Sequence, residues 1–166
     1  MLDIENCRTH IKNSIDNADL QLYPYPHMFI ENIFPIDIYK EMLINMPIQN
    51  NYSPIQEKRM VRGSDQRFVI LFDELENLNI EKKKKEFWSE IHRSIMNSRF
   101  THVLTSKFAN LIKMRFSGQQ GVKLKDEMML VQDRTNYYLG PHTDSKNKVI
   151  TVLFYWPEND ENDHLG

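Results

Sequence analysis

The sequence is poor in cysteine, in charge of one sign and in long apolar runs, and each shortage excludes a class of protein. Among 166 residues there is one cysteine, Cys7, which excludes an internal disulfide framework and favours a reducing compartment. No run approaches the roughly 18 apolar residues of a membrane span, and the N-terminus lacks the pattern of a secretory signal. We therefore expect a soluble, cytoplasmic protein without a membrane partner.

Charge and composition bear on the class of partner and on the number of domains. The net charge is −2 and the basic residues are scattered, so no broad cationic face indicates nucleic acid as a partner. The one basic run, Lys82–Lys85, is flanked by Glu81 and Glu86 and predicts a solvated helix start. With 40% hydrophobic and 27% charged residues, the chain can bury a core, and we expect one domain over residues 1–166.

Apolar periodicity predicts mainly helices early in the chain and strands later. A spacing near 3.6 residues predicts helices over Leu2–Leu20, Pro35–Met46, Glu81–Asn97 and Phe100–Phe116. Apolar and β-branched runs predict strands over His27–Ile33, Gln66–Phe72, Glu127–Arg134 and Lys148–Trp156, with a loop over Gln49–Asp65. Together these elements indicate an α+β fold, with a largely helical portion over about residues 1–120 and a β portion over about 121–166.

One stretch near the end of the chain contains the candidate metal ligands. His142 and Asp144 follow a Gly-Pro turn and precede Val149–Trp156, which is strongly apolar. In extended backbone, residues two apart project from the same face, so this imidazole and carboxylate can bind one metal ion. They would then be two ligands of the 2-His-1-carboxylate triad of non-haem Fe(II) oxygenases. An isolated pair of this kind is most often a turn or surface feature, so its surroundings matter.

Those surroundings resemble a known family. Asp133–Pro157 resembles the metal-binding segment of the 2-oxoglutarate/Fe(II)-dependent dioxygenase superfamily, in its prolyl-hydroxylase-like branch, and Tyr25–Pro35 resembles an N-terminal segment of such proteins. The resemblance implies helices packed on a partial jelly-roll, the double-stranded β-helix. It also implies Fe(II) and 2-oxoglutarate as cofactors, with ascorbate as a further candidate. The implied activity is hydroxylation of an unactivated C–H bond in a small-molecule or peptide substrate, with release of succinate and CO2.

The resemblance also suggests residues that contact the cofactor. Alternation along Lys148–Trp156 places Thr151 and Tyr155 on one face. Tyr155 is the first candidate for a 2-oxoglutarate contact and Thr151 the second, while Tyr138 is a candidate for shaping the iron pocket. Each also has an ordinary explanation, because threonine and tyrosine are common in core strands and in packing.

Two functional residues of the family have no match. These are the second metal-binding histidine and the Arg or Lys that binds the distal carboxylate of 2-oxoglutarate; His164, in a polar segment, is a weak substitute for the histidine. We therefore expect the chain to represent the N-terminal part of an oxygenase, with an incomplete metal site and little activity alone. Two alternatives stay open: a cupin-like jelly-roll that binds without redox chemistry, and a metal-free interaction domain or inactive remnant. The oligomeric state and the substrate are not encoded in any recognisable pattern.

Overall fold

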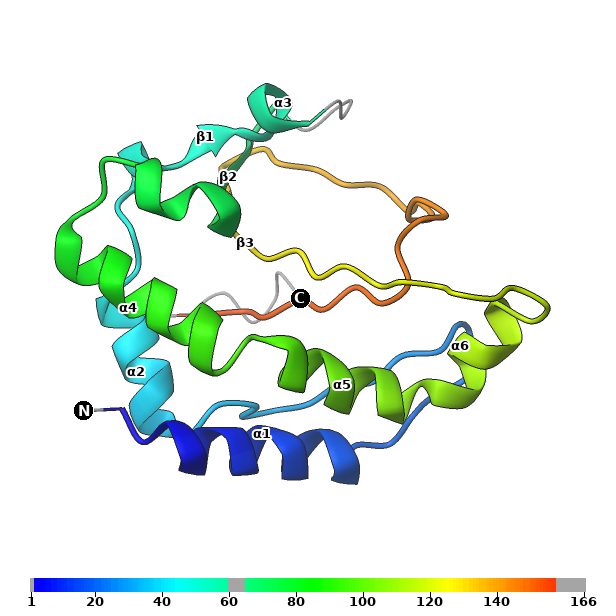
Figure 1. The fold of residues 1–166 in the computed structure, drawn as a ribbon. Coiled ribbons are helices and arrows are strands. Elements are labelled where there is room, and N and C mark those ends of the chain that lie inside the picture. Colours follow the sequence, from blue (N-terminus) through cyan, green and yellow to red (C-terminus); the bar gives the residue numbers. More distant parts are fainter. Residues whose placement is uncertain (1, 60–64, 158–166) are drawn as a thin grey trace.

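A computed structural model describes residues 2–59 and 65–157 (Figure 1). The helices in chain order are α1 (Ile4–Asn17), α2 (Ile36–Ile44), α3 (Ile55–Lys58), α4 (Lys82–Ser94), α5 (Ser98–Lys107) and α6 (Ala109–Arg115). The strands are β1 (Ser53–Pro54), β2 (Arg67–Leu71) and β3 (Met129–Asp133), and two 3-10 helices are η1 (Gln49–Asn51) and η2 (Phe72–Asn77). This combination of helices with a small antiparallel sheet confirms the α+β class.

The sheet has the order β1-β2-β3, and both pairings are antiparallel. Arg67 lies opposite Asp133 and Leu71 opposite Met129. Val69 and Ile70 of β2 and Leu130 of β3 are almost fully buried, which explains why apolar runs marked these strands. The strand predictions over Gln66–Phe72 and Glu127–Arg134 are confirmed, with both ends slightly shorter.

Helix α1 forms because its apolar residues recur on one face and its start is capped. The Asp3 carboxylate accepts a hydrogen bond from the Asn6 amide at 3.0 Å, which satisfies one of the free N–H groups at the helix start. Cys7, Ile11 and Ile15 form the buried face. This confirms the expected covering helix, although it ends at Asn17 rather than at Leu20.

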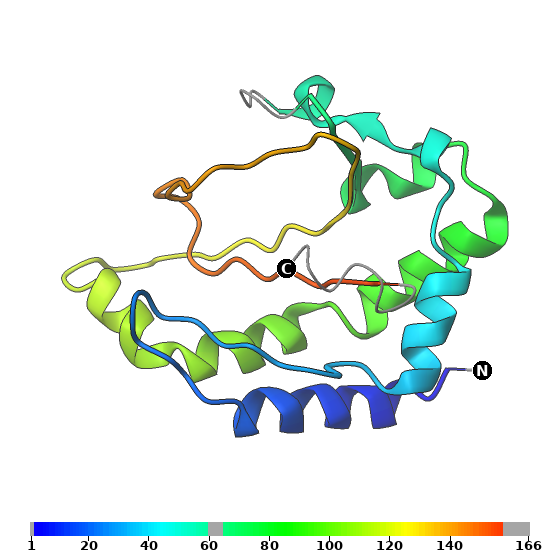
Figure 2. The ribbon, with the colours of Figure 1, turned by 180° about the vertical axis from the view of Figure 1, so that it is seen from behind.

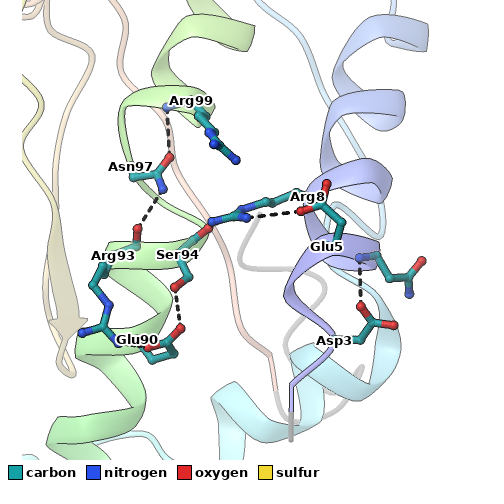
Figure 3. A network of polar contacts seen from close by, with 9 residues as sticks. Asp3, Glu5, Arg8, Glu90, Arg93, Ser94, Asn97 and Arg99 are labelled. Carbon is teal, nitrogen blue, oxygen red and sulfur yellow. Dashed lines mark hydrogen bonds and ion pairs between the residues drawn. The ribbon is translucent and has the colours of Figure 1, made fainter.

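A polar network ties α1 to the junction of α4 and α5 (Figure 3). The Arg8 guanidinium donates through Nε to the Ser94 carbonyl at 2.6 Å, at the end of α4, and through another nitrogen to Glu5 at 3.3 Å. Asn97 then caps α5 by accepting from the Arg99 amide at 2.9 Å. The Ser94 carbonyl at the end of α4 and the Arg99 amide at the start of α5 thus have partners, and α1 packs along α5 (Figure 1).

The hydrophobic core lies between the helices and the sheet. Trp88 of α4 is fully buried, and its indole N–H donates to the Asn45 carbonyl at 2.9 Å, just after α2. Other members of the core come from every layer: Cys7, Ile11, Ile15, Phe34, Ile38, Met42, Tyr52, Ile70, Phe72, Leu75, Ile80, Ile91, Ile95, Leu104 and Leu130. Burial of this many large apolar side chains is the main stabilising contribution to the fold.

The predicted strand over Lys148–Trp156 is wrong as a strand, and its predicted alternation of faces fails at Val152, which is 40% exposed. Within the described residues the segment finds no ladder partner and runs as irregular chain. Its even-numbered residues Phe154 and Trp156 pack on the core: the Phe154 ring lies 5.2 Å from that of Phe34 and 6.1 Å from that of Phe100, between ring centroids. Seen from either side (Figures 1 and 2), residues 148–157 run along α4 and α5.

Three other local predictions need correction. His27–Ile33 is not a strand, because only His27 pairs, in an isolated bridge with Gln21. The predicted helix Phe100–Phe116 is divided at Phe108 into α5 and α6. The expected loop over Gln49–Asp65 contains η1, β1 and α3, and part of it lies outside the described residues.

Candidate metal site

The segment that carries His142 and Asp144 is anchored at its start by the end of β3. Both Nε and a terminal nitrogen of Arg67 donate to the Asp133 carboxylate, each at 2.7 Å. The same guanidinium lies 4.4 Å above the ring centroid of Tyr137. Between Asp133 and Tyr137 the chain turns, and Asn136 lies in the left-handed region at φ +70°. Asparagine tolerates this conformation better than most residues do. The direction in which the segment leaves the sheet is therefore held by a bidentate ion pair.

The far side of the segment is anchored by helices. The Arg115 guanidinium at the end of α6 donates to the Lys146 carbonyl at 2.6 Å. A turn follows, in which the Lys148 amide donates to the Ser145 carbonyl at 2.9 Å. Beyond it, Tyr39 of α2 donates its hydroxyl to the Pro157 carbonyl at 2.5 Å. The pair thus sits on an exposed segment whose two flanks are fixed to the sheet and to the helices.

His142 presents one ring nitrogen to Asp144. Its Nδ1 lies 3.0 Å from the Gly140 carbonyl, and because a carbonyl only accepts, Nδ1 carries a hydrogen; in the neutral imidazole Nε2 then has the free lone pair. Nε2 lies 3.9 Å from Asp144 Oδ1. Bonds of roughly 2.0–2.2 Å to one metal ion would bring two neighbouring ligand atoms to about 3 Å. A closure of about 1 Å is within the reach of side-chain rotation, and both side chains are open to solvent, 49% and 38% exposed.

The Asp144 carboxylate is held by two hydrogen bonds on different oxygens. Lys148 Nζ donates to Oδ1 at 2.8 Å, and the Thr151 hydroxyl donates to Oδ2 at 2.7 Å. These two bonds, with Lys148 the larger cause, lower the pKa of the Asp144 carboxyl below its ordinary value. The group is therefore a carboxylate at neutral pH, which is the form that binds metals.

The three residues expected to contact a cofactor occupy different positions. Thr151 is exposed and donates its hydroxyl to the Asp144 carboxylate at 2.7 Å. Tyr155, four residues further on, is 66% exposed. The hydrogen bond to Asp133 is the main cause that raises the pKa of the Arg67 guanidinium, and the phenol of Tyr155 is the smallest contributor. Tyr138 is 76% exposed and covers Gly140, where its hydroxyl oxygen would stand 3.3 Å from an added Cβ. The structure thus brings Thr151 to the pair directly, and places Tyr138 beside the backbone that orients His142.

In the part of the chain that the structure describes, no third His, Cys, Asp or Glu joins His142 and Asp144. The weak substitute His164 lies outside the described residues. One neighbour was missed by sequence reasoning, namely Lys148, whose signal was its spacing of four residues from Asp144 across an Asn-Lys turn. An imidazole nitrogen and a carboxylate oxygen are donor types that suit a first-row divalent metal at two coordination positions.

Two cavities among the described residues lie away from this pair. One of about 440 Å³ is lined by α6 and the segment that follows it, and one of about 190 Å³ lies between α1 and α5.

No helix in residues 2–59 or 65–157 combines the length and the apolar character needed to cross a membrane. Comparison of the chain with protein-family models, with curated proteins and with solved structures found no match.

Proposed function

We propose that this protein belongs functionally with the Fe(II)- and 2-oxoglutarate-dependent oxygenases, and that His142 and Asp144 are two of its metal ligands. The observation that carries the proposal is the geometry of the pair: Nε2 of His142 faces Oδ1 of Asp144 at 3.9 Å, while Nδ1 is occupied by the Gly140 carbonyl. A metal-binding histidine usually donates its second ring N–H to such an acceptor, which fixes the tautomer and the ring orientation.

The surrounding residues support the same proposal. Thr151 holds one oxygen of Asp144 by a 2.7 Å hydrogen bond, which leaves the other oxygen directed at His142. Tyr155 offers an exposed phenol on the same segment as a donor to an oxo-acid. When bound, Fe(II) and 2-oxoglutarate supply the activation of dioxygen needed to hydroxylate a C–H bond, with succinate and CO2 as co-products, and the protein supplies ligation and orientation.

We also propose that the observed helices and sheet are part of a double-stranded β-helix. The α+β arrangement, with its antiparallel sheet, would be the helical cover and the first strands of a double-stranded β-helix. Over residues 153–156, core-facing Phe154 and Trp156 alternate with exposed Leu153 and Tyr155, as residues in a strand of such a barrel would. The substrate would be a small molecule or a peptide that reaches the open side of the pair.

Metal binding by ligand variants tests the proposal. Manganese(II), a spectroscopic substitute for iron(II), is titrated into the 166-residue protein and free metal is measured by electron paramagnetic resonance. His142→Ala and Asp144→Ala should each lower the affinity at least tenfold, with unchanged circular dichroism because both side chains are exposed. His102→Ala, at an exposed histidine of α5, should bind like the wild type.

A second measurement addresses the reaction. Succinate formation is assayed anaerobically and in air with Fe(II), 2-oxoglutarate and ascorbate, and any turnover should require oxygen and both His142 and Asp144. Metal affinity that is the same in wild type and in both ligand variants would refute the metal site. Tight metal binding without 2-oxoglutarate-dependent turnover would instead favour the cupin-like binding module.

A further inference from the structure

Lys148 competes for the oxygen that the metal proposal needs. Its ammonium lies 2.8 Å from Asp144 Oδ1, the same oxygen that stands 3.9 Å from His142 Nε2. The turn from Ser145 to Lys148 brings the amine back over the carboxylate, since the Lys148 amide is bonded to the Ser145 carbonyl at 2.9 Å. A cation of the protein itself therefore sits on the metal-facing oxygen.

The second oxygen of the carboxylate is in a different situation. Oδ2 accepts from the Thr151 hydroxyl at 2.7 Å, and a neutral hydroxyl neutralises no charge. Thr151 fixes how the carboxylate is turned, and Lys148 supplies the opposing charge. The two neighbours of Asp144 should therefore have opposite effects on a metal ion that binds between Asp144 and His142.

We propose that Lys148 is an internal counter-ion of Asp144 that an incoming divalent metal displaces, and that Thr151 is the positioning residue that keeps Asp144 directed at His142. This inference rests on the proposed function, because it assumes that His142 and Asp144 bind metal. Lysine suits the role: its ammonium is a single point charge on a flexible four-carbon stem, so it can leave without moving the backbone. The Lys148–Asp144 ion pair is also solvent-exposed, with side chains 49% and 38% accessible. Breaking it therefore costs little free energy.

The test uses four variants in the same manganese titration. Lys148→Met keeps the length of the apolar stem and removes the charge, and should tighten binding about two- to tenfold. Lys148→Arg keeps the charge and should show no such gain. Lys146→Met removes a charge two positions away, in the same turn, and controls for the general field of the segment. Thr151→Val keeps the shape without the hydroxyl and should weaken binding about 10- to 100-fold, as loss of an outer-shell partner usually does.

The outcomes separate this inference from the proposed function. If binding depends on His142 and Asp144 while Lys148→Met equals the wild type or Lys146→Met, the counter-ion role is wrong and the metal site stands. If Thr151→Val binds like the wild type, the positioning role is wrong. Binding that ignores His142 and Asp144 overturns both. All these side chains are exposed or half-buried on one segment, and circular dichroism of each variant checks that the fold is retained.

Discussion

At the scale of single residues, the carboxylate of Asp144 has a distinct environment on each oxygen. Lys148 and Thr151 bind separate oxygens and lower the pKa of the group. None of this was visible in the pattern that singled out Asp144, because Thr151 lies seven positions away and meets it only through the intervening turn. Sequence spacing predicted the His142–Asp144 pair, whereas the side chains that orient it depend on how the chain turns between residues 144 and 151.

Cys7 gives a prediction at the same scale. The thiol is fully buried, and burial raises its pKa from 9.0 to about 11. Because the folded state holds the proton more tightly than the unfolded state, the associated stability is complete below pH 9 and is lost as the pH rises toward 11.

Urea unfolding at a series of pH values measures the effect. Between pH 9 and 11 the wild type should lose about 2 kcal/mol more than Cys7→Ala, since a pKa difference of one unit corresponds to about 1.4 kcal/mol. Tyr52, whose pKa burial raises to about 12, contributes equally to both proteins. Parallel pH curves for the two proteins would show that the thiol does not titrate in this way.

At the scale of elements, the segment over residues 148–157 is held by side chains rather than by a ladder. Phe154 contacts Phe34 and Phe100, and Trp156 lies edge-on to Trp88 with 6.1 Å between ring centroids. Aromatic contacts of this kind contribute beyond their buried area. They connect residues 148–157 to α4 and α5.

Alanine substitutions on the two faces of this segment should have different effects on stability, because only one face packs on the core. Phe154→Ala removes a ring packed in the core and should lower the free energy of unfolding by about 2–3 kcal/mol. Leu153→Ala, at a side chain 68% exposed, should change it by less than about 0.5 kcal/mol. Chemical denaturation monitored by tryptophan fluorescence gives both values, and equal losses would mean that the segment is not anchored by its core-facing rings.

The elements also show where sequence reasoning succeeds. Helix α1 was located because Cys7, Ile11 and Ile15 recur at helical spacing, a property of the segment itself. The strand expected over His27–Ile33 failed because a strand needs a partner, and residues after His27 pack Met28, Ile30 and Ile33 on the core without one. The same reason accounts for Lys148–Trp156, whose predicted pairing is absent and whose predicted alternation holds except at Val152. Local pattern predicts faces well, but pairing is a property of two segments together.

At the scale of the whole molecule, large apolar side chains are exposed both on β3 and on residues 148–157. Within the described residues, β3 pairs on one edge only, and its Val131 is 44% exposed. On the segment after the turn, Leu153 and Tyr155 are 68% and 66% exposed. An open strand edge with apolar neighbours promotes association between copies.

Sedimentation velocity over a concentration series tests this expectation. The 166-residue protein should self-associate as its concentration rises, and Val131→Lys with Leu153→Lys should shift it toward monomer, because edge lysines oppose edge pairing. Leu22→Lys is the matched control: that leucine is 64% exposed but lies in the segment after α1. A wild type that is monomeric at every concentration would contradict self-association. If Leu22→Lys shifts the protein toward monomer as much as the other two substitutions do, the association does not depend on Val131 and Leu153.

The pairing of β2 with β3 bears on how the chain folds as it is made. Arg67 and Asp133 are 66 positions apart, and α4, α5 and α6 lie between the two strands. At roughly 5–20 residues per second of synthesis, β2 waits on the order of several seconds for its partner. During that interval Val69 and Ile70, both 1% exposed in the finished fold, lack their partners in β3, Val131 and Leu130. Newly made chains should therefore pass through a state in which β2 is paired on one edge only, with the two-residue strand β1.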